Sequence, residues 1–301
     1  ICFALLSIEF FVPLRLLGSF FHVGLNGVSA VQLLSSVLET EIEVEDGKIE
    51  WNIDGNLTLC AVSYTYPTGK KALRNLDLTI SKGLFTGIVG ESGSGKTTLS
   101  HLLQRFIKPT QGAIFIGSVA MNDLSTRQIH ETIGSVNNTA HLFSGTIYSN
   151  LQMAKEDLTE KQAIDLLHFV KLSEFCHDIY ATVISEGLNL SSGQRQKLAI
   201  ARMLLKNPEI MIFDEATANV DQQSERDIFH IIEQLRMQGK TIIVITHRLQ
   251  NLLNSDEIIM LENGQIIEKG SHKTLMQQQG KYAHLYVEQQ SLESFEIEIG
   301  A

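Results

Sequence analysis

The spacing of apolar positions divides this chain into segments of different character. The first 21 residues are apolar apart from Glu9 and Arg15, with no polar stripe at helical spacing. A complete membrane span needs about 20 mainly apolar residues, and this run is interrupted by charges. We therefore interpret residues 1–40 as the inner end of a transmembrane helix and its cytoplasmic extension, with a core helix of a soluble domain as the alternative. The chain begins with Ile, so we expect it to be part of a longer protein.

The next segment is acidic and polar, and it predicts a linker or an entering edge strand over residues 41–56. After it come β-rich runs at residues 57–66 and 76–80. Apolar strands then alternate with amphipathic helices to about residue 270. Such alternation predicts an α/β fold with a mostly parallel sheet.

Composition narrows the class of protein. With 301 residues and 44% hydrophobic content, the chain can bury a large core. Its net charge is −10, and acidic and basic residues are interspersed along the chain rather than gathered in runs, which argues against nucleic acid as a partner. The cysteines Cys2, Cys60 and Cys176 form no CxxC pair, so we expect reduced thiols and no zinc site.

A phosphate-binding loop follows the apolar strand predicted at residues 85–89. Residues 90–98 fit the pattern GxxxxGK[ST], and apolar residues at helical spacing follow. Glycines let backbone N–H groups turn toward phosphate oxygens, and the helix N-terminus adds partial positive charge. We expect Lys96 to reach the β and γ phosphates and Thr97 to hold Mg²⁺. The candidate nucleotide contacts are Gly90, Ser92, Gly93, Ser94, Gly95, Lys96, Thr97 and Thr98.

Two adjacent carboxylates end a second apolar strand at residues 210–213. Parallel α/β sheets place their ligands at the carboxyl ends of strands. Asp214 suits a Mg²⁺ ion held through water, and Glu215 suits a base that polarises the attacking water.

Residues 190–194 read Leu-Ser-Ser-Gly-Gln, which resembles the LSGGQ signature of ATP-binding-cassette (ABC) ATPases. A helix is predicted after it, ending before Asn207-Pro208 and the second apolar strand. The resemblance assigns Ser191, Ser192, Gly193 and Gln194 to the nucleotide of a partner copy. Ser192 departs from the family pattern because it replaces the first glycine of the signature pair.

Other positions match family elements one by one. Tyr66 resembles the aromatic residue that stacks on adenine, with Tyr64 as the alternative. Asn138 stands where the family usually has a glutamine that contacts Mg²⁺, and it is one methylene shorter. Residues 218–221 resemble the D-loop, and His247, after a strand predicted at residues 241–245, resembles the switch histidine.

The resemblance implies a P-loop NTPase with a RecA-like core, an antiparallel β edge and an inserted α-helical lobe at roughly residues 147–195. The ABC ATPase domain would span residues 57–292, followed by a tail at 293–301. It implies ATP and Mg²⁺ as cofactors, with Glu215, His247 and Lys96 as catalytic residues. The expected partners are a second, identical or different, half-transporter and the chain's own membrane domain upstream, at the cytoplasmic face of the cell membrane.

Exporter-like features include the segments at residues 11–27 and 270–275. The first is weakly similar to the exporter pair linked to cytochrome bd assembly. Two other functions stay open: a soluble ABC ATPase of DNA repair or translation, and a regulatory module that binds ATP without hydrolysing it. Asn138 favours the second of these, whereas Glu215 and His247 oppose it. The sequence does not indicate a transported substrate.

Overall fold

A computed structural model describes residues 2–39 and 55–299, and the chain divides into two compact units, residues 1–45 and 46–301. The first unit contains one long helix, α1 (Cys2–Leu38), which includes Pro13. Within the part of the chain that the structure describes, one helix is long and apolar enough to cross a membrane, over Arg15–Ser35, and none of that segment is buried. The apolar run thus continues well past residue 21.

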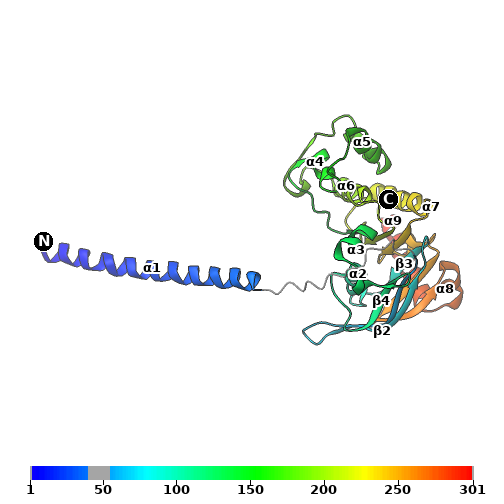
Figure 1. The fold of residues 1–301 in the computed structure, drawn as a ribbon, viewed down its shortest axis with the longest axis horizontal. Helices are drawn as coiled ribbons and strands as arrows, with labels where there is room; N and C mark the ends of the chain where they lie inside the picture. Colours follow the sequence, from blue (N-terminus) through cyan, green and yellow to red (C-terminus); the bar gives the residue numbers. More distant parts are fainter. Residues whose placement is uncertain (1, 40–54, 300–301) are drawn as a thin grey trace. The chain divides into compact units, whose positions relative to one another are not determined.

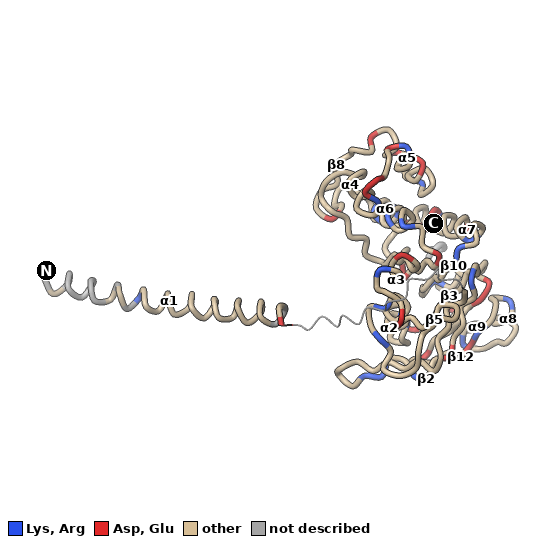
Figure 2. The backbone as a smooth tube through the Cα atoms, in the orientation of Figure 1, with Lys and Arg blue, Asp and Glu red and all other residues tan. Residues whose placement is uncertain are grey.

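Charge is distributed differently in the two units. Figure 2 shows very few charged residues along the described length of α1, whereas basic and acidic residues are interspersed over the α/β domain. Many large apolar side chains in the described part of α1 are exposed, and Phe20 and Phe21 are both more than half accessible.

The second unit begins with an antiparallel sheet in the order β2-β1-β4-β5. Its strands are β1 (Leu57–Thr65), β2 (Lys71–Ile80), β4 (Gln111–Ile116) and β5 (Val119–Ala120). Leu57, Leu59 and Val62 of β1 are buried and pack on the core side of this sheet. The predicted antiparallel β edge is confirmed.

A six-stranded sheet, in the order β12-β11-β3-β10-β9-β6, forms the centre of the domain. Its strands are β3 (Phe85–Val89), β6 (Ile133–Asn137), β9 (Ile210–Asp214), β10 (Thr241–Ile245), β11 (Glu257–Glu262) and β12 (Gln265–Gly270). Every residue of β3 and β10 is buried, as expected for strands covered on both faces. All pairings are parallel except that of β11 with β12, so the predicted α/β fold is confirmed.

Helices pack around this sheet (Figure 1). They are α2 (Lys96–Leu103), α3 (Thr126–Thr132), α7 (Gln222–Met237), α8 (His272–Gln278) and α9 (Lys281–Ile299). The apolar side of α7, including Ile228, Ile231 and Ile232, joins the same buried cluster as Phe213 of β9. The 3-10 helices are η1 (Met121–Asp123), η2 (Ser173–Phe175), η3 (Ser185–Gly187) and η4 (Leu249–Leu252).

A helical lobe extends away from the two sheets, with α4 and α5 at its outer end (Figure 1). Its helices are α4 (Ile147–Gln152), α5 (Glu160–Phe169) and α6 (Ser192–Leu205), and β7 (Gly145–Thr146) pairs with β8 (Thr182–Val183). Ser191 begins α6 as an N-cap whose hydroxyl accepts from the backbone N–H of Gln194. The predicted lobe of residues 147–195 starts with α4, and its end falls inside α6.

Candidate active site

The phosphate-loop residues join the buried strand β3 to helix α2, as the sequence predicts. Gly90 has φ 155°, and a Cβ there would lie 2.2 Å from the carbonyl oxygen of Leu261. Gly95, the N-cap of α2, has φ 110°, and its Cβ would lie 2.8 Å from the carbonyl oxygen of Ala72. Only glycine fits these positions, which allows the loop to fold tightly between two neighbouring segments.

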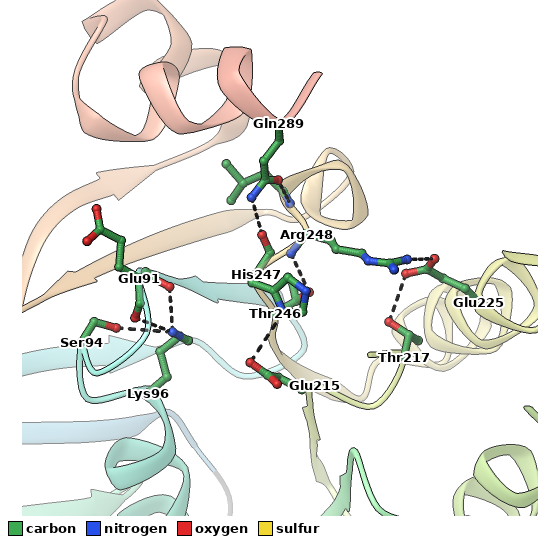
Figure 3. A network of polar contacts seen from close by, with 12 residues as sticks. Glu91, Ser94, Lys96, Glu215, Thr217, Glu225, Thr246, His247, Arg248 and Gln289 are labelled. Atoms are coloured by element: carbon green, nitrogen blue, oxygen red, sulfur yellow. Dashed lines mark hydrogen bonds and ion pairs between the residues drawn. The ribbon is translucent and has the colours of Figure 1, made fainter. Parts of the chain in front are cut away.

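Lys96 points into this loop. Its ammonium group donates to the carbonyl oxygens of Gly90 (2.7 Å) and Glu91 (2.8 Å). Figure 3 shows these contacts together with the longer one to the hydroxyl of Ser94, at 3.5 Å. Burial lowers the pKa of Lys96, while the carboxylates of Glu215 and Asp214 oppose that shift. The ammonium is thus held at the loop and feels the negative charge of both Asp214 and Glu215.

Asp214 and Glu215 lie at the carboxyl end of β9. Asp214 pairs in register with Ile245 of β10 and with Asn137 of β6. Burial raises the pKa of Asp214, and a hydrogen bond from Ser100 opposes this shift. Glu215 has φ 50°, a left-handed conformation that is uncommon for a residue other than glycine, and its N–H donates to the carbonyl oxygen of Ile245 at 2.8 Å. Such backbone strain is often found at functional sites.

His247 follows β10 and faces the same acid. Its Nδ1 lies 3.7 Å from Oε1 of Glu215 (Figure 3). Both side chains remain partly accessible, at 55% and 34% of their surface. A water molecule or a phosphate group can therefore reach the carboxylate and the imidazole.

A cavity of about 570 Å³ lies between these elements. Its walls contain most of the predicted nucleotide contacts, together with Glu215 and His247, whereas Ser94 and Asp214 are not among the residues that line it. The Tyr66 hydroxyl is 2.9 Å from Oγ1 of Thr98, which places the aromatic ring beside the phosphate loop. Tyr64 packs edge-on against Tyr66. The predicted residues in the wall are Tyr66, Gly90, Ser92, Gly93, Gly95, Lys96, Thr97, Thr98, Glu215 and His247.

Asn138 and the signature segment do not line this cavity. Asn138 and Ser192 line a second hollow of about 260 Å³, together with Asn219. The amide oxygen of Asn138 accepts from the hydroxyl of Thr139 at 3.1 Å. Within one chain the structure does not bring Asn138, Ser191, Ser192, Gly193 or Gln194 to the phosphate-loop cavity. That the signature residues serve a partner's nucleotide stays a prediction.

The signature segment packs closely against the start of α7. A Cβ on Gly193 would lie 2.0 Å from Oγ of Ser224 and 2.4 Å from its Cβ. The amide of Gln194 is engaged on both sides: its oxygen accepts from the N–H of Ser191 at 2.8 Å, and its nitrogen donates to Glu174 at 3.0 Å. The glycine at position 193 is thus required by packing.

The sequence alone does not predict two residues that support the site, Glu225 and Gln289. Glu225 of α7 accepts hydrogen bonds from Thr217, Arg248 and Asn251, and so joins the segment after β9 to the segment after β10. Gln289 of α9 lines the cavity and contacts the backbone around His247. Neither residue belongs to a motif of characteristic spacing, and only the fold brings them to the site.

Comparison with known proteins agrees with this geometry. The family model of the ABC transporter domain matches residues 73–218. An uncharacterized ABC transporter ATP-binding protein of Haemophilus influenzae is 42% identical over 97% of this chain and 53% of its own length. An ATP-dependent lipid A-core flippase of Chromobacterium violaceum is 37% identical over 92% of this chain and 48% of its own length. The chain spans about half the length of the curated relatives that it matches.

A solved structure extends the match to three dimensions. The ATP-bound structure of a bacterial Atm1-family ABC exporter superimposes with a TM-score of 0.79 at 30% identity, covering 93% of this chain and 50% of that one. Along the chain the phosphate loop comes first, then the signature segment, then the acid pair at the end of β9, which is the order that the resemblance requires. The chain therefore belongs to the ABC transporter family, and its α/β domain is a nucleotide-binding domain of the ABC exporter kind.

Proposed function

We propose that this domain hydrolyses ATP and that a membrane-spanning exporter uses the energy to move its substrate. The observation that carries the proposal is the position of Glu215 and His247 on the wall of the phosphate-loop cavity, 3.7 Å apart. Phosphoryl transfer to water needs positioning and charge stabilisation, together with a group that orients the water. The carboxylate of Glu215 is placed to accept the proton of that water, and His247 to orient it.

Mg²⁺ fits the residues at this site. No group of three or more His, Cys, Asp or Glu side chains suited to a metal occurs among the residues the structure describes. Mg²⁺ needs no such cage, because it usually takes one or two protein oxygens and completes its shell with phosphates and water. Thr97 and Asp214 would supply those oxygens, with Asn138 as a third candidate. The ion would neutralise charge on the β and γ phosphates.

The remaining residues bind and orient the nucleotide. Lys96, already held at the loop by two carbonyl oxygens, is placed to exchange those contacts for phosphate oxygens. Tyr66 would stack on the adenine. The signature segment Ser191 to Gln194 lies outside the chain's own cavity, so we propose that a second half-transporter completes each site. The membrane domain to which α1 would belong then responds to closing and opening of this pair.

Measuring Mg-ATPase turnover of the full chain in detergent tests the proposal. Glu215→Gln keeps the shape of the side chain and removes its basicity, so ATP affinity should persist while turnover falls by about 10² to 10⁴. Lys96→Ala should instead weaken ATP binding, because it removes the charge that faces the phosphates. A parent chain that binds ATP without turning it over would favour the regulatory module. A Glu215→Gln variant with parental turnover would refute the role of Glu215 as the base.

A further inference from the structure

A glutamine of the C-terminal helix α9 makes two hydrogen bonds to the loop that carries His247. The amide nitrogen of Gln289 donates to the carbonyl oxygen of His247 at 2.6 Å. Its amide oxygen accepts from the N–H of Leu249 at 3.0 Å. The two halves of one side chain thus hold the backbone on both sides of Arg248 (Figure 3).

We propose that Gln289 is a positioning residue for His247, and that α9 is part of the hydrolytic machinery. This inference rests on the proposed function, because it concerns the same reaction. A side-chain amide that meets a backbone C=O and a nearby backbone N–H at once fixes both the position and the direction of a loop. The ring of His247 must stay near Glu215 for the two to act on one water molecule, so the position of the His247 backbone matters for the reaction.

The helix that carries Gln289 is itself firmly held. The carboxylate of Glu268 accepts from the backbone N–H groups of Lys281 (2.5 Å) and Tyr282 (3.1 Å), the first two residues of α9. A carboxylate at this end also complements the helix dipole. The Tyr282 side chain is fully buried, and its hydroxyl lies 2.8 Å from Nδ1 of His272. A rigid support of this kind transmits the position of the helix to the side chain that it carries.

The same helix also contacts the phosphate loop. The ammonium of Lys281 lies 2.9 Å from Oε1 of Glu91 and also pairs with Glu262. Leu285, one helical turn before Gln289 and on the same face, lines the cavity beside it. One helix therefore contacts both loops between which ATP would be hydrolysed, and Gln289 makes the contact at the histidine.

Substitution by methionine tests the contact with little disturbance of the helix. Methionine has about the length and helix propensity of glutamine but donates and accepts nothing comparable. The neighbouring Gln290 is a matched control, because it is exposed and makes only a 3.4 Å contact with the Tyr286 hydroxyl. Gln289→Met should lower kcat about tenfold or more and leave the KM for ATP within about twofold, since a misplacement of about 1 Å can cost 10²-fold. Gln290→Met should behave as the parent.

A double mutant separates positioning from a general structural effect. If Gln289 acts through His247, then adding Gln289→Met to His247→Ala should change kcat by less than about twofold. Full additivity of the two losses would overturn the proposal. So would a rise in KM with unchanged kcat, which would indicate that Gln289 contacts the nucleotide itself.

Amide hydrogen exchange of the full chain without ATP tests the contact independently of turnover. The Leu249 amide should exchange about tenfold faster in Gln289→Met than in the parent, because it loses its acceptor, and at the parental rate in Gln290→Met. Equal exchange in all three proteins would overturn the inference. A parent chain without turnover would instead refute the proposed function, whereas a parent that hydrolyses ATP beside an equally active Gln289→Met would refute this inference alone.

Discussion

The carboxylate of Glu225 should contribute far more to stability than an ordinary ion pair on the surface of this domain. Its side chain is only 10% exposed, and it accepts from Arg248 at 2.5 Å, Asn251 at 2.8 Å and Thr217 at 3.1 Å. The variant Glu225→Ala removes the acceptor of all three donors. Thr217 is itself buried, so its hydroxyl would be left without a partner.

The expected loss in the free energy of unfolding depends on how deeply each partner of Glu225 is buried. Breaking a fully buried ion pair costs about 3 to 5 kcal/mol, but the Arg248 side chain is 42% exposed and can regain water. We therefore expect Glu225→Ala to lower the free energy of unfolding by about 3 kcal/mol, including the unpaired Thr217. For a domain of this size that corresponds to a fall in Tm of about 6 to 12 °C.

The prediction is tested by measuring the free energies of unfolding of Glu225→Ala and Glu131→Ala in urea and comparing each with the parent. Glu131 pairs with Arg127 at 2.8 Å, yet the two side chains are 59% and 86% exposed. Removing such a surface pair should cost less than about 0.5 kcal/mol. If both variants unfold within about 0.5 kcal/mol of the parent, the carboxylate of Glu225 does not hold these segments together and the reasoning fails.

Three further outcomes are expected. Because burial raises the pKa of Asp214, its ionised form destabilises the fold. Asp214→Asn should therefore raise Tm near pH 7; this advantage should shrink as the pH falls through the raised pKa of Asp214 and disappear below the pKa of the unfolded carboxyl, and a lower Tm near pH 7 would contradict this. Gly193→Ala should destabilise by about 1 to 3 kcal/mol in urea, since the added Cβ would meet Ser224 at 2.0 Å, whereas Ser192→Ala should stay within about 0.5 kcal/mol. Deleting residues 1–45 should leave a folded domain that sediments as a single species without detergent, because the apolar helix α1 has no buried segment over Arg15–Ser35; aggregation of both forms alike would refute this.

The parts of the site that the sequence predicts are those held by contiguous motifs. The conformation of residues 90–98 can be predicted from the local sequence, because the glycines, the lysine and the start of the helix are neighbours along the chain. The positions of Asp214, at the end of β9, and of His247, just after β10, were predictable for a similar reason, since an apolar run followed by a polar residue indicates where a parallel strand ends.

Other parts depend on contacts between distant segments. Gln289 lies 42 residues from His247, and nothing in the sequence near either indicates the pairing. The left-handed backbone of Glu215 was also not predictable, because glutamate has no preference for that conformation. The position of Asn138 was assigned from the family pattern alone. Its side chain lines the second hollow, and its expected role with Mg²⁺ stays a prediction.

The close approach of Gly193 to Ser224 has a consequence for how sequences of this kind can diverge. The first glycine of the signature pair is already a serine here, at a position that faces a hollow. The second glycine of the pair, Gly193, lies where any side chain would overlap both the Cβ and the Oγ of Ser224. A side chain at residue 193 should therefore destabilise the domain least when residue 224 is glycine. Among homologues these two positions should change as a pair, although they lie on different helices and 31 residues apart in the sequence.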